Sequence, residues 1–182
     1  MKTHILCLGD SNTHGYCADP NDCADHGIRF NEEERWTCRL QKALGNEYLV
    51  TEEGLSGRTT VFVDPIHESM DALSVIYALL KSHEVIDLLI IMLGTNDVKE
   101  RFGANAACIA AGMVHIFNPQ LILIGGGVSA QQKLLIAPIA AKVKASVMPA
   151  FAEGLEIRAA QLHNDAGMVG AVYYFRQTME KE

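Results

Sequence analysis

Short apolar runs that end in glycine or polar residues recur along the chain, with room for a helix between them. Such runs are typical of strands buried in a parallel sheet. The intervening segments carry apolar residues at helical spacing, as Trp36, Leu40 and Leu44 do. The sequence therefore predicts five strands, at residues 4–8, 48–50, 87–93, 121–124 and 155–159.

The helices predicted between and after these strands cover residues 31–44, 71–82, 104–117, 129–148 and 165–179. Pro138 should kink or split the fourth helix, because proline lacks the amide hydrogen that a helix interior uses. Regular alternation of strands and helices is typical of a parallel sheet with right-handed crossovers. We expect one α/β domain over residues 1–182, with a three-layer α/β/α architecture in which a five-stranded parallel sheet forms the middle layer.

Composition excludes several classes of protein. The 15 basic and 22 acidic residues give a net charge of −7, which disfavours nucleic acid as a partner. No apolar run approaches the roughly 18 to 20 residues of a membrane span, and the first residues do not look like a signal peptide. We therefore expect no membrane partner and a cytoplasmic location.

Cysteine usage favours reduced thiols over a disulfide framework or a zinc site. The five cysteines are odd in number, and none of them forms a Cys-x-x-Cys pair. These cysteines are Cys7, Cys17, Cys23, Cys38 and Cys108. No metal or other cofactor is expected.

Three polar turns follow the first three predicted strands, and they contain Ser11, Gly57 and Asn96. Ligands bind where the strands of an open α/β sheet end, because loops and helix N-termini converge there. A serine at such a turn can attack a carbonyl carbon, while backbone N–H groups and an asparagine amide bind the oxyanion. The alternatives are a helix cap for Ser11, an ordinary turn glycine for Gly57, and a cap or Asx-turn for Asn96.

Residues 9–12 read Gly-Asp-Ser-Asn, residues 55–58 Leu-Ser-Gly-Arg, and residues 94–97 Gly-Thr-Asn-Asp. In combination these strings resemble the first three sequence blocks of SGNH (GDSL-type) hydrolases. Arg35-Trp36 and the longer strings at 54–60 and 91–97 are similar to the arylesterase-like branch of that family, and the likeness covers about residues 1–103. The resemblance implies a flavodoxin-like, SGNH-hydrolase-like fold. It also implies that Ser11 is the nucleophile and that the Ser11 N–H, the Gly57 N–H and Asn96 form the oxyanion hole. We expect Asp10 to brace the nucleophile turn and Asp97 to cap the next helix.

The general base is where the chain departs from that family. SGNH hydrolases carry an Asp-x-x-His block before the last helix, and residues 160–163 read Ala-Gln-Leu-His instead. His163 is either the base or a surface histidine at a helix start. Asp165 either orients it or caps the helix. The literal Asp-x-x-His, Asp64 to His67, lies between the second and third strands, which is the wrong topological place.

The second half of the chain has a different resemblance. Residues 118–129 and 160–171 resemble the C-terminal segment of ROK-family sugar kinases and repressors, over about residues 104–182. That resemblance places the glycines at 125–127 near a nucleotide, but the first phosphate-binding loop, the catalytic Asp and the Cys/His zinc cluster of the family are absent. We interpret the chain as a recombined one, joined near Gly103.

The sequence as a whole favours a carboxylic-ester hydrolase that acts on small acyl esters. Two alternatives stay open. One is a non-catalytic scaffold with negligible turnover, since the family's Asp before His163 is missing. The other is weak nucleotide or sugar binding through residues 125–127. The oligomeric state, a homo-oligomer included, is left open.

Overall fold

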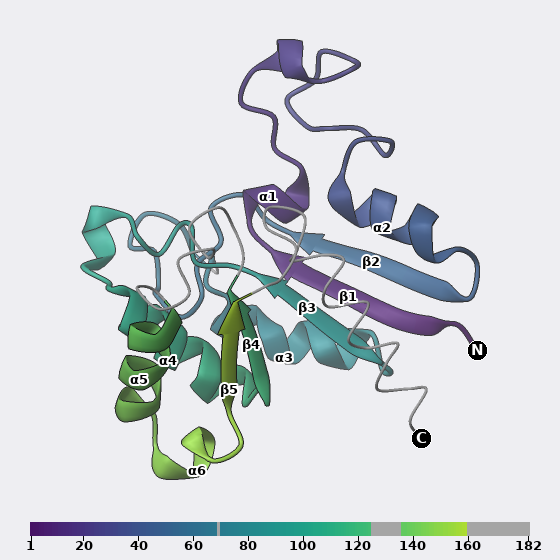
Figure 1. The fold of residues 1–182 in the computed structure, drawn as a ribbon. Coiled ribbons are helices and arrows are strands. Elements are labelled where there is room, and N and C mark those ends of the chain that lie inside the picture. Colours follow the sequence, from purple (N-terminus) through teal and green to yellow (C-terminus); the bar gives the residue numbers. More distant parts are fainter. Residues whose placement is uncertain (69, 125–135, 160–182) are drawn as a thin grey trace. The chain divides into compact units, whose positions relative to one another are not determined.

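The computed structural model of the chain describes residues 1–68, 70–124 and 136–159 (Figure 1). Close contacts divide the chain into two compact units, Met1–Gly103 and Ala104–Glu182. Both units are of the α/β type with parallel strands. That they form one domain stays a prediction.

The first unit holds a three-stranded parallel sheet in the order β2-β1-β3. Its strands are β1 (Thr3–Gly9), β2 (Tyr48–Gly54) and β3 (Leu88–Met92). Ile5, in the central strand, pairs with Val50 on one side and Leu88 on the other. The side chains of residues 5–8 are all fully buried, which explains why both faces of this strand are apolar in the sequence.

Helices of the first unit begin at polar caps or after turns. They are α1 (Ser11–His14), α2 (Trp36–Leu44) and α3 (Ala72–Ser82), with the 3-10 turns Pro20–Asp22 and Glu100–Phe102. The Asp71 carboxylate accepts the Ser74 N–H at 2.8 Å and so starts α3. Helix α2 lies against β2 (Figure 1).

The prediction that α2 begins at residue 31 is wrong. The Asn31 carbonyl accepts the amides of Glu34 and Arg35 in a turn, and Arg35 then adopts ψ 135°, which is not helical. The helix starts only at Trp36. Apolar spacing marked the helix face correctly, but it could not mark the preceding turn.

The second unit contains α4 (Ala106–Phe117), β4 (Leu121–Ile124), α5 (Ala137–Ser146), α6 (Pro149–Ala152) and β5 (Glu156–Ala159). Strands β4 and β5 are parallel, and Ile122 pairs with Ile157. An apolar cluster of four buried residues comes from α4, from α5 and its C-cap, and from the residue just before β5. These are Val114, Val143, Val147 and Leu155.

Two predictions concern the second half of the chain. Pro138 lies in the first turn of α5, where its missing N–H costs no hydrogen bond, and the part of the predicted helix before residue 136 lies outside the described residues, so the kink or split stays a prediction. The single five-stranded sheet is wrong for the described strands: β3 pairs with β1, and β4 with β5. An apolar run predicts a strand but not its neighbour, since pairing depends on contacts between distant segments. The helix predicted at 165–179 lies outside the described residues.

Candidate active site

The first polar turn, which contains Ser11, lies directly after β1. Asp10 is the N-cap of α1, and its Oδ1 accepts the Asn12 N–H at 2.9 Å. Ser11 is therefore the first helical residue and not the cap. Its side chain is half-buried, and neither its hydroxyl nor its N–H has a hydrogen-bond partner among the described residues.

Two glycines allow α1 to pack directly on the strand ends. A Cβ atom at Gly9 would lie 2.0 Å from Thr13 Oγ1, and one at Gly54 would lie 2.1 Å from the backbone nitrogen of His14. Both distances are far below van der Waals contact, so only glycine fits at these positions. This packing holds the start of α1, and Ser11 with it, at the carboxyl edge of the sheet.

The second turn follows β2 and is bonded to the first. The Leu55 N–H donates to the Gly9 carbonyl oxygen at 3.1 Å, and the Arg58 N–H closes the turn on the Leu55 oxygen at 3.0 Å. Gly57 has φ +92°, a left-handed conformation that favours glycine. Its N–H donates to no acceptor in the described part of the chain, so it is available for a ligand.

The third turn follows β3 and is bonded to the second. The Asn96 side chain is 8% exposed, and its Nδ2 donates to the Arg58 carbonyl oxygen at 3.1 Å. This bond uses one amide hydrogen and orients the group, leaving the other amide hydrogen for a ligand.

Asp97 does not cap a helix, contrary to the prediction. Its Oδ1 accepts from the Thr60 N–H at 2.8 Å and from the Thr60 hydroxyl at 2.5 Å, and the residue is fully buried. The next 3-10 turn has Lys99 at its N-cap. Asp97 therefore joins the second and third turns, a cross-loop role that local sequence cannot show.

Sequence reasoning named Arg58 only as part of a motif, but the structure places it at the centre of the three turns. Its side chain is buried, and Nη1 donates to the Gly9 oxygen at 3.1 Å and to the Glu53 oxygen. Burial lowers the pKa of the guanidinium, against the opposing effect of the Glu53 and Asp10 carboxylates. An arginine in a glycine- and threonine-containing turn is normally read as exposed, so the sequence carried no signal for this burial.

The predicted base residues, His163 and Asp165, lie outside the described residues, as do the glycines at 125–127. The literal Asp-x-x-His does form a pair: Asp64 Oδ2 lies 3.6 Å from His67 Nδ1. A hydrogen bond from the Ile66 N–H at 3.0 Å, together with Arg101 at 2.5 Å, lowers the pKa of the buried Asp64 carboxyl. The His67 side chain is 61% exposed.

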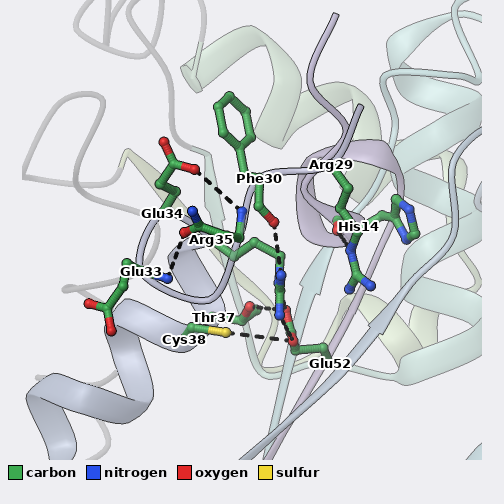
Figure 2. A network of polar contacts seen from close by, with 10 residues as sticks. His14, Arg29, Phe30, Glu33, Glu34, Arg35, Thr37, Cys38 and Glu52 are labelled. Atoms are coloured by element: carbon green, nitrogen blue, oxygen red, sulfur yellow. Dashed lines mark hydrogen bonds and ion pairs between the residues drawn. The ribbon is translucent and has the colours of Figure 1, made fainter. Parts of the chain in front are cut away.

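A polar network fixes the segment that runs from α1 to α2 (Figure 2). Arg35 binds the two oxygens of Glu52 through Nε at 3.0 Å and Nη2 at 3.2 Å, and its Nη1 donates to the Phe30 oxygen at 2.8 Å. Thr37 and Cys38 also donate to Glu52. Because Glu52 belongs to β2, this network ties the segment to the sheet.

Within the described ranges, no set of three or more His, Cys, Asp and Glu side chains could bind a metal ion. Those ranges also contain no helix whose length and apolarity would suffice to cross a membrane.

Solved structures of esterases resemble this chain over nearly its whole length. The native aryl esterase of M. Smegmatis is 26% identical with a TM-score of 0.66, over 98% of this chain and 99% of that one. A carbohydrate acetylesterase family member from Sinorhizobium meliloti is 26% identical with a TM-score of 0.64, over 98% and 99% of the two chains. The expected resemblance to SGNH-type, arylesterase-like hydrolases is confirmed.

Sequence relatives point to a second family. The glucokinase of Thermotoga maritima is 36% identical over 80 residues, which are 44% of this chain and 25% of that protein. The chain therefore spans about a quarter of the length of this curated relative. The family model described as "ROK family" matches residues 81–178. It begins within α3 and thus includes the third polar turn. Because this match covers more than half of the chain, the protein belongs to the ROK family.

Proposed function

We propose that the chain is a serine esterase of the SGNH type that acts on small acyl esters. One observation carries the proposal: two hydrogen bonds, from Asn96 to the Arg58 oxygen and from Arg58 to the Gly9 oxygen, link the turns that bear the candidate groups. The similarity to an aryl esterase and to a carbohydrate acetylesterase family member supports it.

In the proposed reaction, Ser11 Oγ attacks the carbonyl carbon of the ester. The resulting oxyanion accepts hydrogen bonds from the N–H groups of Ser11 and Gly57 and from Asn96 Nδ2. Each such donor is typically worth about 3 to 4 kcal/mol of transition-state stabilisation. Loss of the alcohol leaves an acyl-serine, and attack of water on it releases the acid and restores the hydroxyl.

The proposed base is His163, which takes the Ser11 proton and returns it to the leaving alcohol, with Asp165 as the orienting carboxylate. This part of the proposal requires an SGNH-type arrangement in which both units contribute to one domain. The family's own orienting carboxylate, the Asp of the Asp-x-x-His block, is missing. Its loss is expected to lower kcat by up to about 10⁴-fold, so slow turnover is consistent with the proposal.

Hydrolysis of p-nitrophenyl acetate tests the proposal. The wild type should release p-nitrophenol, and Ser11→Ala should reduce the rate to background. Ser82→Ala is the matched control, because Ser82 is an exposed serine at the end of α3 and donates only to the Leu79 oxygen. A fluorophosphonate should label the wild type once and Ser11→Ala not at all. Equal hydrolysis by the wild type and Ser11→Ala would remove Ser11 from the mechanism.

The ROK match favours a second candidate, which is nucleotide or sugar binding by the second unit. Free backbone N–H groups of a glycine turn can bind phosphate, and residues 125–127 are such a sequence. Calorimetry with ATP and Mg²⁺, and separately with glucose, decides it. The absence of heat at millimolar ligand would leave the esterase or a non-catalytic scaffold.

A further inference from the structure

We propose that Arg58 is the positioning residue of this site, which holds the nucleophile turn and both oxyanion-binding turns in one arrangement. The inference rests on the proposed esterase function and assigns a role that the sequence motifs do not. All of its evidence lies within the first unit.

The Arg58 side chain fixes the nucleophile turn. Nη1 donates to the Gly9 carbonyl oxygen at 3.1 Å, and the Leu55 N–H donates to the same oxygen at 3.1 Å. Gly9 is the last residue of β1 and precedes Ser11 by two positions. The end of β1 is thus attached to the second turn by one side-chain and one backbone hydrogen bond. Loss of the guanidinium would leave only the backbone bond.

The Arg58 backbone fixes the other two donors. Its carbonyl oxygen accepts from Asn96 Nδ2 at 3.1 Å, a contact that spans 38 positions in sequence. Its own N–H bond to the Leu55 oxygen closes the turn that presents Gly57. One residue therefore contacts the first and third turns while it belongs to the second. A shift of Arg58 would displace the Gly57 N–H and the Asn96 amide together.

Burial and charge argue against a role in folding alone. Arg58 is 6% exposed, and its Nε has no hydrogen-bond partner among the described residues. The Asp10 carboxylate, fully buried, also has one oxygen without a partner there. Buried charged groups are costly, and apolar residues of similar volume often serve stability equally well. Incomplete pairing next to Ser11 and Gly57 is what we expect where positioning matters more than stability.

The test compares Arg58→Lys and Arg58→Met with Arg39→Lys, an exposed arginine on α2. Lysine keeps the positive charge but lacks the planar guanidinium with its several N–H donors, and methionine keeps only the approximate volume. We expect kcat for p-nitrophenyl acetate to fall about tenfold to a hundredfold in Arg58→Lys and further in Arg58→Met, with KM within about twofold. Arg39→Lys should behave as the wild type.

Amide hydrogen exchange supplies a readout that needs no activity. In Arg58→Lys, exchange should accelerate in peptides covering residues 9–14 and 53–60 and stay unchanged in α2 and α3. An unchanged kcat with a lowered Tm, or exchange that rises evenly through the first unit, would overturn the positioning role. A wild type without Ser11-dependent hydrolysis would contradict the esterase proposal. In that case the exchange pattern alone still decides whether Arg58 joins the turns.

Discussion

The two units differ in what they bury. In the described part of the chain, every buried polar or charged side chain belongs to the first unit, and the buried residues of the second are aliphatic. Burying a polar group costs free energy unless it finds partners, so a fold does not accumulate such groups for stability. The first unit therefore uses buried positions to place polar groups, whereas the described part of the second unit uses them for apolar packing. The buried polar residues are Asp10, Thr13, Thr37, Arg58, Thr59, Thr60, Asp64, Asp71, Asn96 and Asp97.

The largest expected effect concerns the general base and the unit that contains it. If His163, in the second unit, is the base, His163→Ala should lower kcat for p-nitrophenyl acetate by about 10⁴-fold, because Ser11 then lacks a proton acceptor. His67→Ala is the matched control, since His67 is the histidine paired with Asp64 in the first unit. A loss in His67→Ala with full activity in His163→Ala would confine the whole machinery to the first unit.

The second prediction compares one asparagine from each unit. Asn96→Ala should lower kcat by about 10²- to 10³-fold, as removal of an oxyanion donor does. Asn105 is the N-cap of α4, and its side-chain oxygen accepts the Cys108 N–H at 3.0 Å; Asn105→Ala removes this cap. It should cost about 1 kcal/mol of unfolding free energy and leave kcat unchanged. Denaturant unfolding and initial rates, measured on both variants, test whether Asn96 serves activity and Asn105 serves stability. Equal effects of the two substitutions on kcat would contradict this assignment.

The third prediction concerns packing. Leu155 is 1% exposed in the apolar cluster of the second unit, so Leu155→Ala should destabilise the protein by about 3 kcal/mol. Met148→Ala, at a position 55% exposed, should change stability little. Urea unfolding followed by circular dichroism measures both. A loss below about 1 kcal/mol for Leu155→Ala would mean that this cluster does not hold the second unit together.

The smallest expected effect is a pH dependence of the protein's stability, which comes from the Glu52 network in Figure 2. Burial raises the pKa of the Glu52 carboxyl, but Arg35 and Thr37 outweigh it, so the net pKa is below its usual value. A lowered pKa gives stability that is present above the usual carboxyl pKa of about 4.3 and is lost as pH falls through the folded value.

Glu52→Gln should therefore remove on the order of 1 kcal/mol at neutral pH and flatten the loss of stability in acid. Glu33→Gln is the control. The Glu33 carboxylate pairs with Lys42 at 2.9 Å, but both side chains are more than 70% exposed, and solvent screens the pair. Urea midpoints between neutral pH and pH about 3 compare the two variants; parallel curves for Glu52→Gln and the wild type would be the contrary result.

Much of the fold was predictable because it depends on local pattern. The apolar run at 121–124 predicted β4 with its observed bounds, and the helix predicted at 71–82 matched α3 with Asp71 as its cap. Sheet pairing was not predictable, because it depends on contacts between segments far apart in sequence. The start of α2 also escaped, since the turn before it is held by Glu34 and Arg35 through contacts outside the helix.

The candidate site was predictable only in its chemically distinctive residues. Motif resemblance named Ser11, Gly57 and Asn96, and the structure places each just after one strand of the first sheet, Ser11 as the first residue of α1. Their roles stay predictions. The groups that connect the turns, Arg58 and Asp97, were not identified, because their partners lie up to 49 positions away in sequence. Local pattern shows which residues have suitable chemistry, but not which residues hold them.

The close approach of Gly54 to α1 limits which substitutions the chain can accept. No side chain, not even a methyl group, fits between the end of β2 and the backbone of His14. In a saturation library, position 54 should therefore accept no replacement, whatever is selected at the neighbouring positions. Any graft that gives this first unit a new C-terminal half must likewise keep this glycine, because it preserves the angle at which α1 leaves the sheet.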